Sequence, residues 1–202
     1  MSKPIQLADA TSSLWKQTTV LRNVQGQEEA ISLGPDGNVW SFIADSGDSR
    51  FDATGQRLEN LELPADFVTV SRNAAGAIVV IAAKGLHLQY RTETPLTALD
   101  VSEGLRHRWT PAKTIRLPAI PGAVGVRRLY TQNDFSGMRI ALIVDTETPE
   151  NGQSYVMACS QWTDNGPGPF ILLPPMGAKK PVGPTPAAPT AGNRLFRTAQ
   201  SA

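Results

Sequence analysis

The sequence predicts an all-β protein, and three observations favour this class. Short segments rich in β-branched and aromatic residues recur along the 202 residues, separated by Gly or Asn-Asp turns. Glycine (17) and proline (16) are frequent, which argues against a helical bundle. Helical signals are confined to residues 94–101, where Thr94 and Pro95 favour one or two turns inside a connection.

The expected strands are short, as strands in globular proteins usually are. In the N-terminal half they cover residues 18–21, 29–33, 39–44, 67–72, 78–83 and 86–91. In the C-terminal half they cover residues 112–117, 126–131, 139–145, 154–162 and 170–173. We therefore expect an N-terminal arm over residues 1–14 and one β-repeat domain over residues 15–173.

A repeat is visible inside this domain. Residues 31–42 align with residues 70–81 at an offset of 39, which places Gly37 on Gly76 and Val39 on Ile78. A looser third copy begins at Arg128. A period of about 40 residues with several strands per unit is typical of β-propeller blades, so propeller-like blades of short antiparallel strands are expected.

The number of blades leaves alternatives open, because about three are found and propellers close with about four to eight. A degenerate fourth blade could combine the first and last strands, or two copies of the chain could form six blades. A β-sandwich is the alternative fold.

The stretch Gly34-Pro-Asp-Gly-Asn-Val-Trp40 resembles the G-x-D-G-x-V-W hairpin of tectonin and tachylectin-like propeller lectins. The resemblance covers chiefly residues 27–92. It implies glycan binding, in which aromatic rings stack on sugars while arginine or acidic side chains bond the hydroxyls. The pairs it suggests are Trp40 with Arg50, Tyr90 with Arg72, and Trp162 with Asp164. The alternative is that these aromatic side chains pack between blades.

Catalytic and metal-binding motifs are absent from the sequence. His87 and His107 have no partner at ligand spacing, and Cys159 is the one cysteine. The aspartates of residues 45–52 lack the spacing of a calcium loop and are typical of a hairpin turn. We therefore predict a non-enzymatic protein without a metal or cofactor.

The C-terminal residues 174–202 form a separate segment. Six prolines between Pro174 and Pro189 predict an extended linker. Beyond it, an apolar pair lies between two arginines. One interpretation is a disordered end; the other is a peptide that docks on a partner through Arg194, Leu195, Phe196 and Arg197.

Charge is divided unevenly: residues 1–104 carry a net charge of −5 and residues 105–202 carry +6. This asymmetry favours self-association or a protein partner. Nucleic acid is not expected, because aromatic residues are only 6% and no RNA-binding motif is present.

The longest apolar run, residues 77–83, is too short to span a bilayer, and the start lacks the apolar core of a secretory signal. We expect a cytoplasmic protein, or one exported without a classical signal. The leading hypothesis for function is lectin-like recognition of glycans. The alternative is a structural subunit of a larger protein assembly, anchored by its C-terminal tail.

Overall fold

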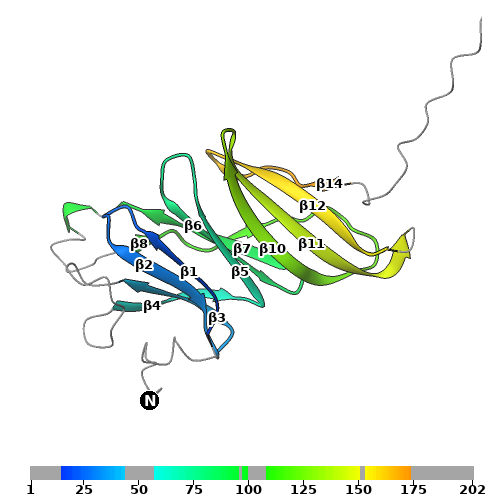
Figure 1. The fold of residues 1–202 in the computed structure, drawn as a ribbon, viewed down its shortest axis with the longest axis horizontal. Coiled ribbons are helices and arrows are strands. Elements are labelled where there is room, and N and C mark those ends of the chain that lie inside the picture. The colour runs from blue at the N-terminus through cyan, green and yellow to red at the C-terminus, as the bar shows by residue number, and fades with distance from the viewer. Residues whose placement is uncertain (1–14, 44–56, 96, 100–107, 151–152, 174–202) are drawn as a thin grey trace, which may run out of the picture.

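The computed structural model describes residues 15–43, 57–95, 97–99, 108–150 and 153–173, and these form three antiparallel sheets in chain order (Figure 1). The all-β class is confirmed. The predicted arm (1–14) and tail (174–202) lie outside the described residues, and only residues 98 and 99 of the described segments are helical.

The first sheet is a meander of four strands that follow one another along the chain. They are β1 (Lys16–Arg22), β2 (Glu28–Leu33), β3 (Asn38–Ile43) and β4 (Arg57–Pro64). The sequence did not predict β4.

The central sheet is built in the same way. Its strands are β5 (Phe67–Arg72), β6 (Ile78–Lys84), β7 (His87–Thr94) and β8 (Arg108–Trp109), with β9 (Lys113–Ile115) also pairing β7. All pairs are antiparallel.

The third sheet contains the longest strands. They are β10 (Ala123–Asp134), β11 (Gly137–Glu150), β12 (Gln153–Thr163), β13 (Gly166–Pro167) and β14 (Ile171–Leu173), and both β13 and β14 pair β12. The prediction of short strands is wrong here. Burial alternates along β11 from Met138 to Thr146, which shows that one face of the strand is covered and the other is open. Such a strand can remain hydrogen-bonded to its neighbours over a long stretch.

The central sheet is buried on both faces. Along β6, Ile78, Val80 and Ala82 belong to a core shared with the first sheet. The intervening residues Val79, Ile81 and Ala83 belong to a core shared with the third sheet. All six are at most 1% exposed, so the three sheets stack on one another through two separate cores.

The first hairpin of each sheet closes with an Asn or Asp three residues before a glycine. The turns are Asn23–Gly26, Asn73–Gly76 and Asp134–Gly137, and each ends on a glycine with positive φ (79°, 81° and 109°). The first two share their backbone bonds: the Asn N–H donates to the carbonyl four residues on, and the glycine N–H donates to the Asn carbonyl. The third departs in its backbone bonds but keeps the side-chain oxygen that accepts a turn N–H.

The alignment that placed Gly37 on Gly76 matches two turns with the same backbone bonds, since the Gly34 N–H donates to the Asn38 carbonyl and the Gly37 N–H to the Gly34 carbonyl. The two turns nevertheless hold different places in their sheets. Gly37 lies in the second hairpin of the first sheet, between β2 and β3, whereas Gly76 lies in the first hairpin of the central sheet. The positions that share both this turn and its place in the sheet are Gly26 and Gly76, 50 residues apart. Repetition of a sheet is present, but its period is longer than the predicted one.

Side-chain hydrogen bonds to backbone N–H groups join the first and central sheets. The carboxylate of Glu93 on β7, only 2% exposed, accepts hydrogen bonds from the backbone N–H of Val24 (2.7 Å) and of Ile78 (3.0 Å). The Gln17 side chain accepts a bond from the N–H of Val68 (2.7 Å). These bonds fix the first hairpin of the first sheet against the central sheet.

Candidate functional site

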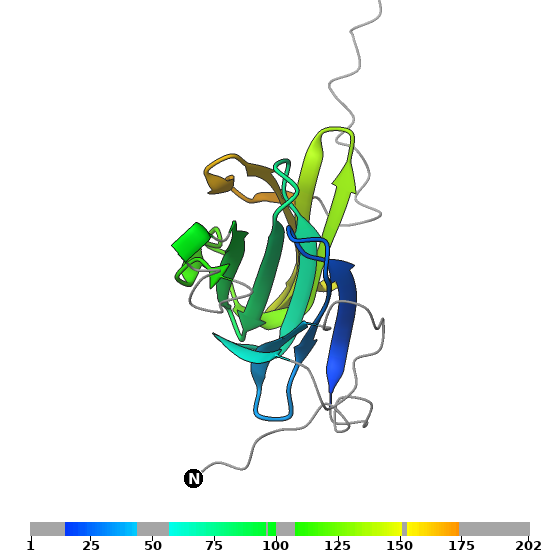
Figure 2. The ribbon, with the colours of Figure 1, turned by 90° about the vertical axis from the view of Figure 1, so that its left-hand side faces the viewer.

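Three hairpin turns meet where the central and third sheets end together. The β5–β6, β10–β11 and β12–β13 turns lie beside one another at the top of Figure 2, in teal, lime and orange. They enclose a cleft of about 330 Å³, which we call the three-turn cleft. Its lining residues are Asn73, Ala74, Ala75, Ser136, Gly137, Met138, Trp162, Thr163 and Asp164.

Local hydrogen bonds hold two of these turns in shape. The Asn73 side-chain oxygen accepts the N–H of Ala77 (3.0 Å), and the Asp134 carboxylate accepts the N–H (2.8 Å) and hydroxyl (2.5 Å) of Ser136. The bonds from Ser136 lower the pKa of Asp134, and Arg139 beside it (3.1 Å) adds to this effect. The cleft walls are thus ordered by the sequence of the turns themselves.

Trp162 is placed by the core beneath the cleft. Its ring meets Tyr90 of β7 edge to face, with centroids 4.9 Å apart and planes at 81°. Tyr90 is only 6% exposed, and its burial raises the pKa of its hydroxyl. Gly166 leaves room for this pair, since a Cβ there would lie 2.6 Å from the Tyr90 oxygen. The indole is half-buried and lines the cleft.

The rim of the cleft offers polar groups. Asp164 is exposed and makes no hydrogen bond or ion pair with any described residue. Gln161 donates to the carbonyl of Ser136 (2.9 Å), which ties β12 to the β10–β11 turn. An aromatic ring beside an unengaged carboxylate can hold a ligand that has both an apolar face and hydroxyl donors.

The other predicted pairs are not assembled in this way. Trp40 is half-buried, and its indole N–H donates to the two oxygens of Asp36 (3.0 and 3.2 Å), at the opposite end of the stack. Arg72 donates to the carbonyl of Gly76 (2.6 Å), and Tyr90 contacts Trp162. The predicted partner of Trp40, Arg50, lies outside the described residues, as do Arg194, Leu195, Phe196 and Arg197.

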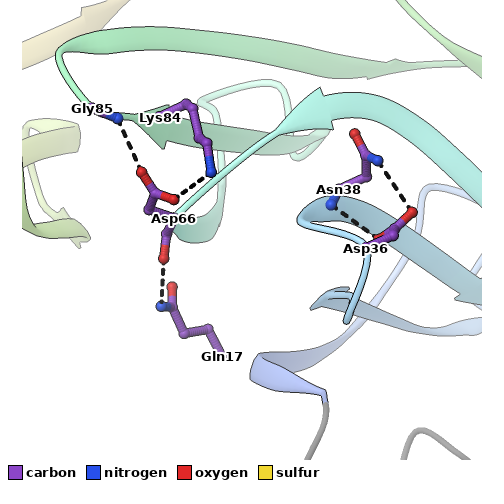
Figure 3. Close-up of polar contacts among 6 residues, drawn as sticks. All are labelled: Gln17, Asp36, Asn38, Asp66, Lys84 and Gly85. Atoms are coloured by element: carbon purple, nitrogen blue, oxygen red, sulfur yellow. Dashed lines mark hydrogen bonds and ion pairs between the residues drawn. The ribbon is translucent and has the colours of Figure 1, made fainter.

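Asp36 is engaged within its own turn. Its carboxylate accepts bonds from the backbone N–H (3.0 Å) and side-chain amide (3.1 Å) of Asn38 (Figure 3). Partial burial raises the pKa of Asp36, but the bonds from Asn38 and Trp40 outweigh it and lower that pKa. The Trp40 indole also covers Gly34, where a Cβ would lie 2.7 Å from the ring. Trp40 therefore completes a hairpin rather than presenting a free ring.

A second cleft, of about 480 Å³, lies between the β2–β3 turn and the ends of β5 and β6. Its carboxylate, Asp66, accepts bonds from the Lys84 ammonium (2.6 Å) and the Gly85 N–H (3.1 Å), as Figure 3 shows. These bonds lower the pKa of Asp66. Gln17 donates to the Asp66 carbonyl (3.4 Å). The acidic group of this cleft is already paired, in contrast to Asp164.

Sequence reasoning missed Asn73 and Ser136 as lining residues. The signal that points to them is the recurrence of Asn or Asp three residues before a glycine, at Asn73–Gly76 and Asp134–Gly137. Within the described ranges, no group of three His, Cys, Asp or Glu side chains is arranged to hold a metal ion. The described residues also contain no helix of the length and apolarity that crossing a membrane requires.

Comparison with known proteins finds no relationship: no family model matches the chain, and no curated protein is similar to it in sequence.

Proposed function

We propose that the protein is a non-enzymatic binding module that recognises glycans in the three-turn cleft. The observation that carries this proposal is the lining of the cleft, where the half-buried Trp162 and the unengaged carboxylate of Asp164 occur together. A sugar ring has an apolar C–H face that packs on an indole. Its hydroxyls donate to a carboxylate, and such charge-assisted bonds are stronger than neutral ones.

The dimensions of the cleft favour a small ligand. Its volume of about 330 Å³ lies near the lower end of the range of about 300–1,000 Å³ for ligand sites. One sugar ring on Trp162 would also lie within reach of the Asn73 amide and of the turn backbone at Ala74 and Ala75. The proposal is therefore a terminal monosaccharide unit rather than a long buried chain.

The scaffold we propose is propeller-like, with each sheet acting as one blade. Three features support it: each sheet is an antiparallel meander, each opens with an Asx-x-x-Gly hairpin, and the central sheet packs on a neighbour through both faces. Turns at one end of stacked sheets are then brought together, which is how the cleft is formed.

The test is binding of the full chain to an array of mono- and oligosaccharides, followed by titration of each sugar that binds. Asp164→Ala is the main variant, because Asp164 is exposed and its truncation is expected to leave the fold intact. Loss of a charged hydrogen bond, about 1.5–3 kcal/mol, predicts affinity about tenfold or more lower. Trp162→Phe, which keeps a ring against Tyr90, is expected to weaken binding less.

Trp40→Phe is the matched control, since Trp40 is also a half-buried indole near an aspartate but lies at the other end of the stack. It should bind as the wild type does. Equal loss in Trp40→Phe, or full binding by Asp164→Ala, would place the site elsewhere. A chain that binds no saccharide on the array would refute glycan recognition itself.

The alternative function, a structural subunit anchored through Arg194–Arg197, depends on residues outside the described ranges. Removal of that segment should abolish copurification with a larger partner if the alternative is correct. It should leave glycan binding unchanged if the cleft is the functional site.

A further inference from the structure

The third sheet has one face that no other described element covers. Strand register shows which side chains share this outer face, because directly opposed residues on neighbouring strands point to the same side. Two adjacent rows cross the middle of the face. One row is Tyr130, Ala141, Cys159 and Ile171, and the next is Arg128, Ile143, Met157 and Leu173.

This outer face is apolar at its centre and remains open to solvent. Ile171 is 65% exposed, Tyr130 52% and Leu173 37%. The opposite face of the same strands is the covered one, with Leu129 and Leu142 at most 7% exposed in the core shared with the central sheet. The rows beside these apolar rows carry charged side chains, Arg139 between Gln132 and Gln161 at one end and Asp145 beside Tyr155 at the other. A polar border around an apolar centre is the layout of a protein interface.

The two ends of the stack differ in this respect. On the first sheet, the face turned away from the central sheet carries Ala30, Ser32 and Phe42, which are 6%, 1% and 1% exposed. Trp15 packs edge to face on Phe42, with ring centroids 5.0 Å apart. The centre of the outer face of the first sheet is therefore already buried, and only its β1 edge, at Val20 opposite Ala30, is open (55% exposed). The third sheet thus offers the broader open apolar face for extending the stack.

We propose that the outer face of the third sheet binds the same face of a second copy of this chain across a two-fold axis. A contact between the third sheet of one copy and the first sheet of another is blocked by Trp15. Only a contact of like with like remains, and such an interface closes as a dimer. Stacking of sheets is also the way in which this chain forms both of its own cores.

Charge along β11 favours one direction of the axis. The outward residues of this strand run Arg139, Ala141, Ile143, Asp145. Each end of the face carries an ion pair within the chain, Arg139 with Asp134 (3.1 Å) at one end and Asp145 with Arg127 (2.5 Å) at the other. A two-fold axis that lies in the interface and crosses the strands between Ala141 and Ile143 places Arg139 opposite Asp145 of the second copy. The same axis places Arg128 opposite the ring of Tyr130, a favourable cation–π arrangement.

An axis parallel to the strands lacks this match, because it sets Arg128 against Leu173 of the second copy.

The size of the face sets the strength of the contact. Four strands about 4.8 Å apart and four rows about 6.8 Å apart span about 500 Å² per copy, or about 1,000 Å² in total. That is the lower limit of specific interfaces, so a weak dimer is expected.

Sedimentation velocity of the full chain, over concentrations of about 5–500 µM that bracket weak association, tests the proposal. The expected result is a mass that rises from that of one chain towards twice that value. Ile171→Glu introduces a charge into the contact at a side chain that the fold leaves mostly exposed. It should weaken association at least about tenfold. The matched control, Val20→Glu, changes a β-strand residue that is 55% exposed on the first sheet, and should associate as the wild type does.

Cys159 gives a second measurement, since it is the one cysteine of the chain and lies on this face. A short bismaleimide should link two wild-type chains and leave Cys159→Ser and Ile171→Glu as single chains. A wild type that stays monomeric throughout, or an Ile171→Glu variant that dimerises normally, overturns the proposal. The proposal is also overturned if the wild type is monomeric and the Leu195→Ser/Phe196→Ser variant dimerises. In that case the C-terminal tail would occupy the outer face in the wild type.

Discussion

Glu29 on β2 makes the stability of the fold depend on pH, and its replacement by glutamine should remove that dependence. The side chain has no solvent exposure (0%). Burial raises its pKa from 4.5 to about 8; the hydroxyl of Ser41, which donates to the carboxylate, opposes this, and the nearby Glu93 and Glu59 add to it. In the folded protein Glu29 is therefore protonated at neutral pH.

The sign of the effect follows from proton binding in the two states. Between pH 4.5 and 8 the folded protein holds a proton on Glu29 that the unfolded chain has lost, so rising pH favours unfolding. The stabilisation is complete below pH 4.5 and disappears as the pH passes 8. With one pKa unit equal to about 1.4 kcal/mol, Glu29 lowers the free energy of unfolding by about 2.5 kcal/mol between pH 5 and pH 7.

Glu29→Gln resembles the protonated acid at every pH, and its carbonyl still accepts the bond from Ser41. Urea unfolding followed by tryptophan fluorescence should show similar stability of variant and wild type at pH 5. At pH 7 the variant should be more stable than the wild type by roughly 2–3 kcal/mol. Glu147→Gln, at an exposed strand position, is the control. A difference between Glu29→Gln and wild type that is the same at both pH values would refute the reasoning.

Two further substitutions test how the sheets are joined. Two backbone N–H groups, those of Val24 and Ile78, donate to the two oxygens of the Glu93 carboxylate. Glu93→Gln replaces one of these oxygens with an amide N–H₂ group, so one backbone N–H loses its acceptor. It should cost about 1–3 kcal/mol in urea unfolding, and an unchanged midpoint would contradict the joint role of this carboxylate. Gly166→Ala forces a side chain onto the Tyr90 hydroxyl at a backbone φ of 111° and should destabilise by about 1–3 kcal/mol. That cost should shrink in a Tyr90→Phe background, and an equal cost in both backgrounds would exclude the clash.

Strands with continuous β-branched residues could be predicted from the sequence. The expected segments 67–72 and 78–83 agree with β5 and β6 to within a residue. The strand β4 was missed, because Leu61 and Leu63 alternate with glutamate and asparagine, residue types with low strand propensity. Their complete burial between the first and central sheets is a tertiary effect, which no local pattern displays.

The register of the repeat could not be predicted from apolar pattern alone. The segments Arg22–Gly26 and Arg72–Gly76 share Arg-Asn-x-x-Gly and are structurally equivalent. The strands that follow them differ, since β2 begins with two glutamates whereas β6 begins with Ile78 and Val79. A sheet covered on both faces requires apolar residues at every position of its middle strand. This requirement removes the sequence similarity between the central sheet and the first sheet.

Part of the candidate site follows from the chain itself, because Trp162 and Asp164 are two residues apart at the end of one strand. The rest depends on topology. Asn73 and Ser136 are 63 positions apart, and only the stacking of two sheets brings their turns to the same cleft. The edge-to-face contact of Tyr90 with Trp162 has the same origin.

The stacking of the sheets also decides where ligands and partners can bind. Both faces of the central sheet are used in cores, so this sheet can meet a ligand only through its turns. At one end those turns contribute to a cleft whose carboxylate, Asp66, is paired with Lys84; at the other they face Asp164, which is not engaged by any described residue. The one broad apolar surface among the described residues is then the outer face of the third sheet. The proposed recognition of a small ligand and the proposed association of copies thus use different surfaces, and loss of either should leave the other unchanged.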